Sequence, residues 1–256
     1  MYPVLFEFGG LEIRSYGVIV ALSFLVAIWM STREAERKGL DPKLVQDFSL
    51  YALIAGIIGA RLYFVLFSAP GYFLENPWEI FAVWTGGIGV IGALIAGFLI
   101  AIWFCRKREI SLLRFGDTLA PGMALGQTLG QFACLFNGDS YGRPTNLPWA
   151  ITYTDPRSLA PLNIPLHPIE IYEMIAYFVV FLLIWRTKKR QAVDGFAFFT
   201  YLAGYGVARF VVDFFRGDPA MFAWGLQAAQ VFGAAMILAG LAGSLLLRNK
   251  GLKFAP

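Results

Sequence analysis

Three arginines lie inside or beside strongly apolar stretches of this sequence. Arg61 falls within an apolar run at 47–68 and Arg209 within another at 195–214, with Arg216 a short way beyond. An ionisable residue at membrane depth is costly unless it is paired or hydrated, so each is a functional candidate. A guanidinium group presents a planar fork of N–H donors that matches a phosphate. The three arginines therefore predict a site for a phosphate-bearing ligand.

A second polar cluster ends the apolar run at 115–137. Residues 137–142 read NGDSYG, where a lipid-like composition gives way to amide, carboxyl, hydroxyl and turn-forming groups. The sole histidine, His167, precedes Pro168 and opens a third polar stretch, HPIEIYE at 167–173. A lone histidine of this kind is more often a capping or structural group than a base. These polar stretches need helices that bring them to one place.

The composition indicates whether those helices lie in water or in a lipid bilayer. The chain has 256 residues, of which 58 % are hydrophobic and 15 % charged, and its mean hydropathy is +0.62. A water-soluble protein of this length cannot hide so much apolar surface, so the sequence predicts a bilayer protein. The pI of about 9.1 does not indicate nucleic-acid binding, because the basic residues form short clusters between apolar runs. Cys105 and Cys134 lie in apolar runs and favour neither a disulfide nor a zinc site. We expect no metal and no cofactor.

Seven apolar runs are long enough to cross a bilayer as helices, each of which needs about 20 residues. The runs are 16–32, 47–68, 79–104, 115–137, 168–186, 195–214 and 224–247. Lys and Arg cluster after the first, third and fifth runs and in the C-terminal tail, which marks those connections as cytoplasmic. We therefore expect an all-α polytopic membrane protein. It would form a single transmembrane domain over 1–256, with the N-terminus outside and the C-terminus inside.

This topology places the polar candidates at one level, in the outer half of the bilayer. At 1.5 Å per residue, Arg61 and Arg209 would each lie roughly 10 Å below the outer surface. Aliphatic helix walls beside such a cluster predict a pocket for a phospholipid whose head group lies at the outer surface. The structural alternative is that Arg209 pairs with Asp213 and that Arg61 extends its side chain to the interface.

Six motifs, in matching order, resemble those of the prolipoprotein diacylglyceryl transferases of bacterial inner membranes. IRSYG at 13–17 resembles the family's R-W-Y-G, GARLYFVLF at 59–67 resembles G-x-R-x-x-Y-V-x-F, and VWTGGIG at 83–89 resembles W-x-GG. NGDSYGRPT at 137–145 resembles the core signature N-G-E/D/C-x-x-G. HPIEIYE at 167–173 resembles H-P-x-Q-x-Y-E, and GYGVARFVVDFFR at 204–216 resembles G-Y-G-x-x-R-x-x-x-E-F-x-R. Each motif alone is weak evidence for the family, but six motifs in matching order on a chain with seven expected helices are specific to it.

The resemblance implies a thiol alkylation. The family transfers the diacylglyceryl unit of phosphatidylglycerol to the lipobox cysteine in the signal peptide of a prolipoprotein, forms a thioether and releases glycerol 1-phosphate. It implies a multi-pass protein of the bacterial inner membrane, with its active site toward the periplasmic half. The implied catalytic residues are Arg209 as the phosphate clamp, Asn137, Asp139 and His167. The implied substrate-binding residues are Tyr16, Arg61, Gly86, Gly87, Gln127, Gln131, Gly138, Tyr141, Gly142, Tyr172, Glu173 and Arg216.

Two departures from the family pattern bear on activity. Gln131 stands where the family usually has an arginine before the N-G element, and Ile91 stands where many members have His or Tyr. The thiol's base is then His167, Asp139, a tyrosine, or water near the lipid phosphate. The departures also admit a divergent paralogue with altered or lost transferase activity. From another class, a small-solute transporter would also have several spans, although no inverted repeat or matching pair of broken helices is visible.

Overall fold

The computed structural model describes residues 3–9, 11–83, 86–87, 89–187, 193–217 and 227–249. Residues 188–190 of the fifth basic connection, 224–226 at the start of the last expected span, and Trp84, Thr85 and Ile88 of the VWTGGIG motif lie outside the described residues. The chain divides into unit 1, Met1–Glu34 with Gly116–Pro256, and unit 2, Ala35–Phe115. Each unit is described by itself below.

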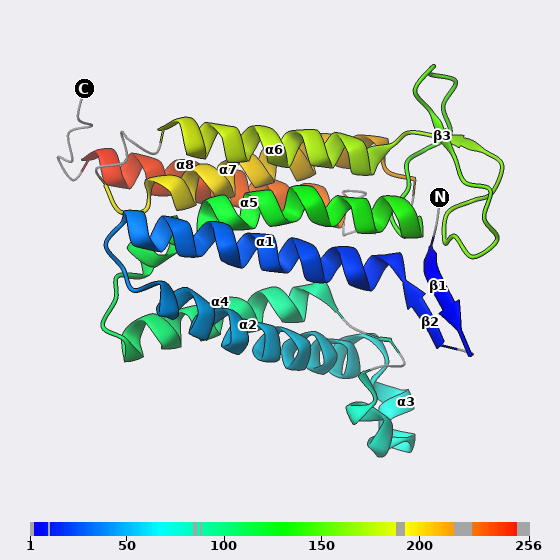
Figure 1. Ribbon diagram of the computed structural model, residues 1–256, viewed down its shortest axis with the longest axis horizontal. Coiled ribbons are helices and arrows are strands. Elements are labelled where there is room, and N and C mark those ends of the chain that lie inside the picture. The colour runs from blue at the N-terminus through cyan, green and yellow to red at the C-terminus, as the bar shows by residue number, and fades with distance from the viewer. Residues whose placement is uncertain are drawn as a thin grey trace. The chain divides into compact units, whose positions relative to one another are not determined.

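Seven helices of 17 residues or more account for most of the described chain (Figure 1). They are α1 (Ser15–Arg37), α2 (Pro42–Tyr63), α4 (Val90–Lys107), α5 (Leu112–Asn137), α6 (Ile169–Thr187), α7 (Phe196–Val212) and α8 (Ala228–Asn249). The mostly helical architecture agrees with the expected fold class. Two small antiparallel sheets, which were not expected, pair β1 (Val4–Phe8) with β2 (Leu11–Arg14) and β3 (Ile151–Thr152) with β4 (Pro165–Leu166).

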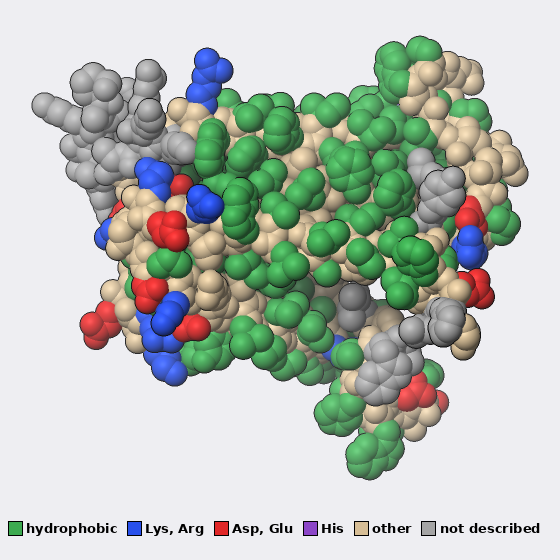
Figure 2. Space-filling view, viewed as in Figure 1, with side chains coloured by type: hydrophobic (Ala, Val, Ile, Leu, Met, Phe, Trp, Pro, Cys, Tyr) green, Lys and Arg blue, Asp and Glu red, His purple; other side chains and the backbone are tan. Residues whose placement is uncertain are grey.

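Five of these helices are long and apolar enough to cross a membrane among the described residues. They lie in Ser15–Arg37, Pro42–Ser68, Val90–Lys107, Phe196–Phe215 and Ala228–Leu247. The other two long helices have polar or helix-breaking residues within them: α6 carries Glu170, Glu173 and Arg186, and α5 carries glutamines, glycines and Pro121. The chain is a polytopic membrane protein. In the space-filling view the side chains along α6 are hydrophobic, and charged side chains gather toward the helix ends (Figure 2).

The third expected span, 79–104, differs from the structure at its beginning. Its helix, α4, begins at Val90, and the chain before it forms the short helices α3 (Pro70–Glu75) and η2 (Pro77–Phe81). Gly86 and Gly87 have φ angles of 88° and 69°, in the left-handed region that a right-handed helix excludes. The expectation that these two glycines belong to the outer part of the third helix is therefore wrong. They belong to a non-helical segment that precedes α4.

Unit 1 consists of α1, α5, α6, α7 and α8 with both sheets. The starts of α1, α6 and α8 and the ends of α5 and α7 lie at the end that carries β1, β2 and β3, which we call the hairpin end (Figure 1). Small residues allow close packing: a Cβ on Gly122 would lie 2.4 Å from the Ala27 carbonyl oxygen of α1. At the opposite end, the Asp117 carboxylate accepts the backbone N–H groups of Gly195 and Phe198, both at 2.8 Å. This buried carboxylate caps the start of α7 from a different helix.

Unit 2 is built on α2 packed against α4. Asp41 caps α2 by accepting the Lys43 N–H at 2.9 Å, so this helix begins before the expected span at 47. Phe48 contacts the rings of Phe104 and Phe115 at centroid distances of 5.6 and 5.1 Å. These aromatic contacts hold one end of unit 2, and α3 lies at the other (Figure 1).

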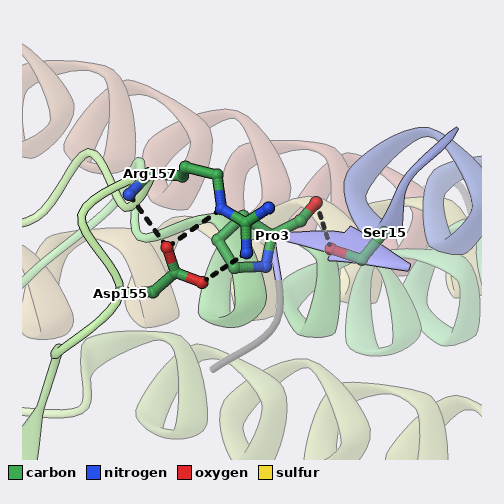
Figure 3. A network of polar contacts seen from close by, with 4 residues as sticks. All are labelled: Pro3, Ser15, Asp155 and Arg157. Carbon is green, nitrogen blue, oxygen red and sulfur yellow. Dashed lines mark hydrogen bonds and ion pairs between the residues drawn. The ribbon is translucent and has the colours of Figure 1, made fainter. Parts of the chain in front are cut away.

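The two connecting structures at the hairpin end are fixed by local hydrogen bonds. The Ser15 hydroxyl donates to the Pro3 carbonyl at 3.2 Å, which ties the N-terminal hairpin to the start of α1 (Figure 3). In the long connection after α5, Arg157 donates to both oxygens of Asp155 at 3.1 and 3.0 Å (Figure 3). Tyr153, fully buried, packs with Ala160 and Leu166 in a small core of that connection. The connection is thus an ordered cover beside the end of α5.

Candidate functional site

The NGDSYG segment forms a turn at the end of α5. Gly138 has a φ angle of 71°, and a Cβ there would lie 2.2 Å from the Ser158 hydroxyl and 3.1 Å from the Tyr153 ring. The Asn137 carbonyl accepts the Leu159 N–H at 3.2 Å. Only glycine combines this backbone conformation with so close an approach. The connection therefore packs directly onto the turn.

The same turn is joined to the segment that follows α7. The Gly217 N–H donates to the Tyr141 carbonyl at 2.9 Å, and Gly142 forms a β-bridge with Arg216. The Arg216 Nη2 donates to the Ser140 hydroxyl at 2.9 Å. These contacts bring together five predicted site residues from two distant motifs: Gly138, Asp139, Tyr141, Gly142 and Arg216. Arg216 thereby has a defined place beside the turn.

Arg209 forms a buried ion pair with Glu173, not with Asp213. Its Nη1 donates to Glu173 Oε1, and Gln131 Nε2 donates to the other carboxylate oxygen, Oε2. The side chains of Arg209 and Glu173 are 20 % and 5 % exposed. The expected alternative partner, Asp213, lies in the short 3₁₀ helix η5 (Asp213–Phe215) after α7 has ended at Val212. Three predicted residues, Gln131, Glu173 and Arg209, thus form one group across α5, α6 and α7.

Two carboxyl oxygens near this group have no hydrogen-bond partner although they are buried. They are Oδ1 of Asp139 and Oε2 of Glu170. The other oxygen of Glu170 accepts the Tyr153 hydroxyl at 2.8 Å. Burial, with Glu170 close by, raises the pKa of Tyr153 well above its ordinary value, so this hydroxyl stays protonated as the donor. Asp139 interacts electrostatically with Tyr16, Cys134, Tyr153 and Glu170, which places Tyr16 in the same neighbourhood.

His167 is held by two aromatic side chains. The Trp149 Nε1–H donates to the Tyr172 hydroxyl at 2.8 Å, and that hydroxyl lies 3.2 Å from His167 Nδ1. The phenol oxygen accepts from Trp149, and the direction of its hydrogen bond with Nδ1 is set by the tautomer of the imidazole. The ring of Phe215 lies 5.2 Å from that of His167. His167 and Tyr172, both predicted, therefore belong to a chain of hydrogen bonds that starts in the long connection.

Unit 1 also carries a group of tyrosines and, at its surface, an apolar groove. Gln127 Oε1 accepts the Tyr201 hydroxyl at 2.9 Å, and Tyr205 stacks on Tyr177 at a centroid distance of 5.6 Å. An apolar groove of about 370 Å³ runs between α1 and α5. Its lining consists of Ile19, Leu22, Ser23, Val26, Leu129, Phe132 and Phe136. The Ser23 hydroxyl donates to the Ile19 carbonyl at 2.7 Å, so the groove suits an acyl chain better than a polar ligand.

The remaining predicted residues, Arg61, Gly86 and Gly87, belong to unit 2. Arg61 is 5 % exposed and points its guanidinium group into the approach to α4. Its Nε donates to Ile80 O at 2.9 Å, its Nη1 to the carbonyls of Gly86 and Gly87 at 2.6 and 3.0 Å, and its Nη2 to the Glu79 carbonyl. A guanidinium group has five N–H donors, so most of its capacity is taken by this loop. The same contacts fix the backbone at Gly86 and Gly87.

Some residues of the site were not singled out from the sequence. Glu170 was noted only as part of the HPIEIYE motif, and Tyr153, Trp149 and Cys134 were not assigned to the site. Trp149 and Tyr153 lie in a long connection of ordinary composition, and only the folded chain shows that they reach α6. Among the described residues, no group of three or more His, Cys, Asp and Glu side chains is placed to hold a metal ion.

Comparison with known proteins gives matches over nearly the whole chain. Residues 3–246 match the family model described as prolipoprotein diacylglyceryl transferase. A phosphatidylglycerol–prolipoprotein diacylglyceryl transferase of Trichormus variabilis is 37 % identical over 251 residues, 94 % of this chain and 88 % of that protein. Proteins with the same description from Corynebacterium diphtheriae and Geobacter sulfurreducens are 35 % and 34 % identical. They cover 95 % and 97 % of this chain and 91 % and 96 % of their own lengths.

Proposed function

This chain belongs to the prolipoprotein diacylglyceryl transferase family, and on that premise we propose that it transfers diacylglyceryl from phosphatidylglycerol to prolipoproteins. The acceptor is the lipobox cysteine thiol of the signal peptide, the product is a thioether, and glycerol 1-phosphate leaves. The observation that carries the proposal is the family match over residues 3–246, in which all six motifs fall. The relatives are matched over most of their length, so the resemblance is not confined to a shared helical segment.

The proposed topology has seven spans within a single transmembrane domain over 1–256. The five helices that are apolar enough to cross are joined by α5 and α6, whose polar residues face one another inside unit 1 through the Gln131–Glu173 contact. Within unit 1 successive helices run in opposite directions (Figure 1). The clusters of Lys and Arg at alternate connections support an outside N-terminus, an inside C-terminus and a hairpin end that faces the periplasm across the bacterial inner membrane.

Arg209 is the proposed phosphate clamp. One of its nitrogens is fixed by Glu173, and 20 % of the side chain remains exposed. A preorganised guanidinium group stabilises the negative charge that develops on a leaving phosphate without having to reorganise. Glu173 and Gln131 hold that group in place, and Arg216, beside Ser140, adds positive charge at the same end of α7. The apolar groove between α1 and α5 is the proposed place for an acyl chain.

The other predicted residues take supporting roles in this proposal. Asn137, Gly138, Tyr141 and Gly142 shape the turn that faces the lipid head group. Tyr16 approaches it from the start of α1, and Gln127 with Tyr201 forms the floor. His167 and Tyr172 orient the acceptor side. Arg61 has a structural role: by donating to the carbonyls of Gly86 and Gly87, and to those of Glu79 and Ile80, it fixes the two glycines.

A second candidate is a divergent family member with altered or lost transferase activity. The observation that favours it is the neutral Gln131 against Glu173, because this position usually carries an arginine in the family and that positive charge is missing here. Gln131→Arg separates the two candidates. If position 131 faces the phosphate, the added positive charge raises the turnover of phosphatidylglycerol or the affinity for this lipid. Unchanged turnover and unchanged lipid affinity would show that this placement is wrong.

The activity itself is tested by complementation of a bacterium depleted of its own transferase. The wild-type chain should restore growth and the lipidation of a reporter prolipoprotein, and Arg209→Ala should not. Arg108→Ala is the matched control, since Arg108 pairs on the exposed surface with Asp47 and lies in unit 2. Failure of the wild type to lipidate the reporter, with the protein present in the membrane, would reject the transferase in favour of the second candidate.

A further inference from the structure

Two carboxyl groups of the hairpin end each have a buried oxygen without a hydrogen-bond donor. Glu170 is 1 % exposed, and its Oε2 lacks a partner while its Oε1 is bound by Tyr153. Asp139 is half-buried, and its Oδ1 is likewise buried without a partner. The two carboxyl groups interact electrostatically. Burying an unpaired carboxylate oxygen is costly, so such an atom indicates either a bound proton or the place of a donor supplied by a ligand.

We propose that Asp139 and Glu170 form one carboxyl pair that accepts the proton of the acceptor thiol. This inference rests on the proposed transferase function. Two neighbouring carboxyl groups in a medium of low dielectric cannot both ionise cheaply, so the pair holds one proton and one negative charge. Asp139 is the member that a substrate reaches, and Glu170, held by Tyr153, is a positioning residue that keeps the shared charge in place.

The surroundings of the pair favour this role. The groups that interact with it are Tyr16 of α1, Cys134 of α5, Tyr153 of the long connection and Glu173 of α6. Glu173 is engaged by Arg209 and Gln131, and Tyr153 is a donor. Cys134 places a sulfur atom of the protein itself beside Asp139.

His167, one of the other bases that the sequence offers, already has one ring nitrogen occupied. His167 Nδ1 lies 3.2 Å from the Tyr172 hydroxyl, which itself accepts from Trp149, so this nitrogen is engaged by the phenol. The carboxyl pair, in contrast, has two buried oxygens without a hydrogen-bond partner.

The chemical step balances without a further reactant. The S–H proton moves to the charged carboxylate of the pair, and the thiolate sulfur attacks the glyceryl carbon that carries the phosphate. The C–S bond forms as the C–O bond breaks, and its electron pair leaves with the phosphate oxygen of glycerol 1-phosphate. The proton on the pair then passes to that phosphate or to water, and the pair returns to its single negative charge.

A selenocysteine acceptor tests the proposal, because a selenol ionises at lower pH than a thiol and needs no base. The assay uses the purified full-length protein, phosphatidylglycerol micelles and a lipobox peptide with either cysteine or selenocysteine. We expect Asp139→Asn and Glu170→Gln to lower kcat with the cysteine peptide by about 100-fold or more, the usual contribution of general base catalysis. With the selenocysteine peptide both variants should approach the wild type, and so should Asp139→Glu with either peptide. Asp47→Asn, an exposed carboxyl-to-amide change in unit 2, is the matched control.

The possible outcomes distinguish a failure of the carboxyl-pair inference from a failure of the proposed transferase function. Equal losses with both peptides mean that the carboxyls are structural, and no loss with either means that the thiol has another base; both results overturn the inference alone. A wild-type protein inert toward both peptides overturns the transferase function, and the inference with it. Infrared spectroscopy gives a readout independent of activity. The carbonyl band of a protonated carboxyl should be present in the wild type and weaker in Glu170→Gln, and an unchanged band refutes a shared proton.

Discussion

The ion pair between Arg209 and Glu173 gives the sharpest test of the phosphate clamp. Glu173→Gln removes the negative charge and keeps the shape and a hydrogen-bonding oxygen. At an effective dielectric constant of 20, two charges 4 Å apart interact by about 4 kcal/mol, and breaking a buried pair costs about 3–5 kcal/mol. Since Arg209 is only 20 % exposed, little of this is screened by water. We expect a loss of about 3 kcal/mol, or about 6–12 °C in Tm for a chain of this size.

The effect of phosphatidylglycerol on this loss of stability shows whether Arg209 faces the lipid phosphate. In the variant Arg209 has no carboxylate, so the phosphate of phosphatidylglycerol can take its place. Thermal unfolding is measured in phosphatidylcholine micelles with and without phosphatidylglycerol. At about 100 times its Kd the lipid contributes about 2.7 kcal/mol, so most of the lost Tm should return in the variant, while the wild type gains less.

The control for this experiment is Asp47→Asn. Asp47 and Arg108 lie 2.9 Å apart, but their side chains are 47 % and 44 % exposed, and such pairs contribute about 1 kcal/mol or less. Its Tm should change little and should not depend on the lipid. Equal stabilisation of wild type and Glu173→Gln by phosphatidylglycerol would refute the idea that Arg209 faces the lipid phosphate.

Three further predictions concern the supports of the site. Asp117→Ala removes the carboxylate that accepts two N–H groups at the start of α7. The change should cost about 3 kcal/mol, seen as a lower Tm. An unchanged Tm would refute the capping role. Arg61→Lys cannot reproduce a fork that binds several carbonyls, so limited proteolysis should cut 79–87 about tenfold faster, and equal rates would count against the loop clamp. Hydrogen bonds from Arg157 lower the pKa of Asp155 to about 2. Their stabilisation is therefore complete above the unfolded value of about 3.9 and is lost as the pH falls through about 2, which NMR titration of Arg157 should follow; a midpoint near 3.9 would contradict it.

The long helices could be predicted because the bilayer makes them visible in the sequence. A helix facing lipid must be apolar over its whole length, so runs such as 16–32 and 195–214 correspond to α1 and α7 with small errors at the ends. The error was larger at 79–104, where hydropathy does not register backbone conformation. Gly86 and Gly87 adopt positive φ, and Arg61 binds their carbonyl oxygens, which composition alone does not reveal.

Residue types in the site were easier to predict than their partners. Spacing along one helix favoured Asp213 for Arg209, because residues four apart share a face. That rule requires the helix to continue, and α7 ends at Val212. Glu173 comes from α6 instead, and the choice depends on how α5, α6 and α7 pack. The same limitation hid Tyr153 and Glu170, whose contact joins a long connection to a helix start.

These contacts determine how an anionic lipid head group can be recognised. Arg209 is matched by Glu173, while Asp139 and Glu170 each keep an oxygen without a partner, so this group of side chains offers no surplus of positive charge. Simple attraction therefore does not explain binding of a phosphate, and a site that merely bound the ground state tightly would not speed the reaction. Under the proposed mechanism, a guanidinium group already held by Glu173 responds to charge that grows on the leaving oxygen, while the carboxyl pair withdraws the thiol proton. On this reasoning catalysis depends on where Arg209 and Asp139 are held, and Gln131, Glu173, Glu170 and Tyr153 are the residues that hold them.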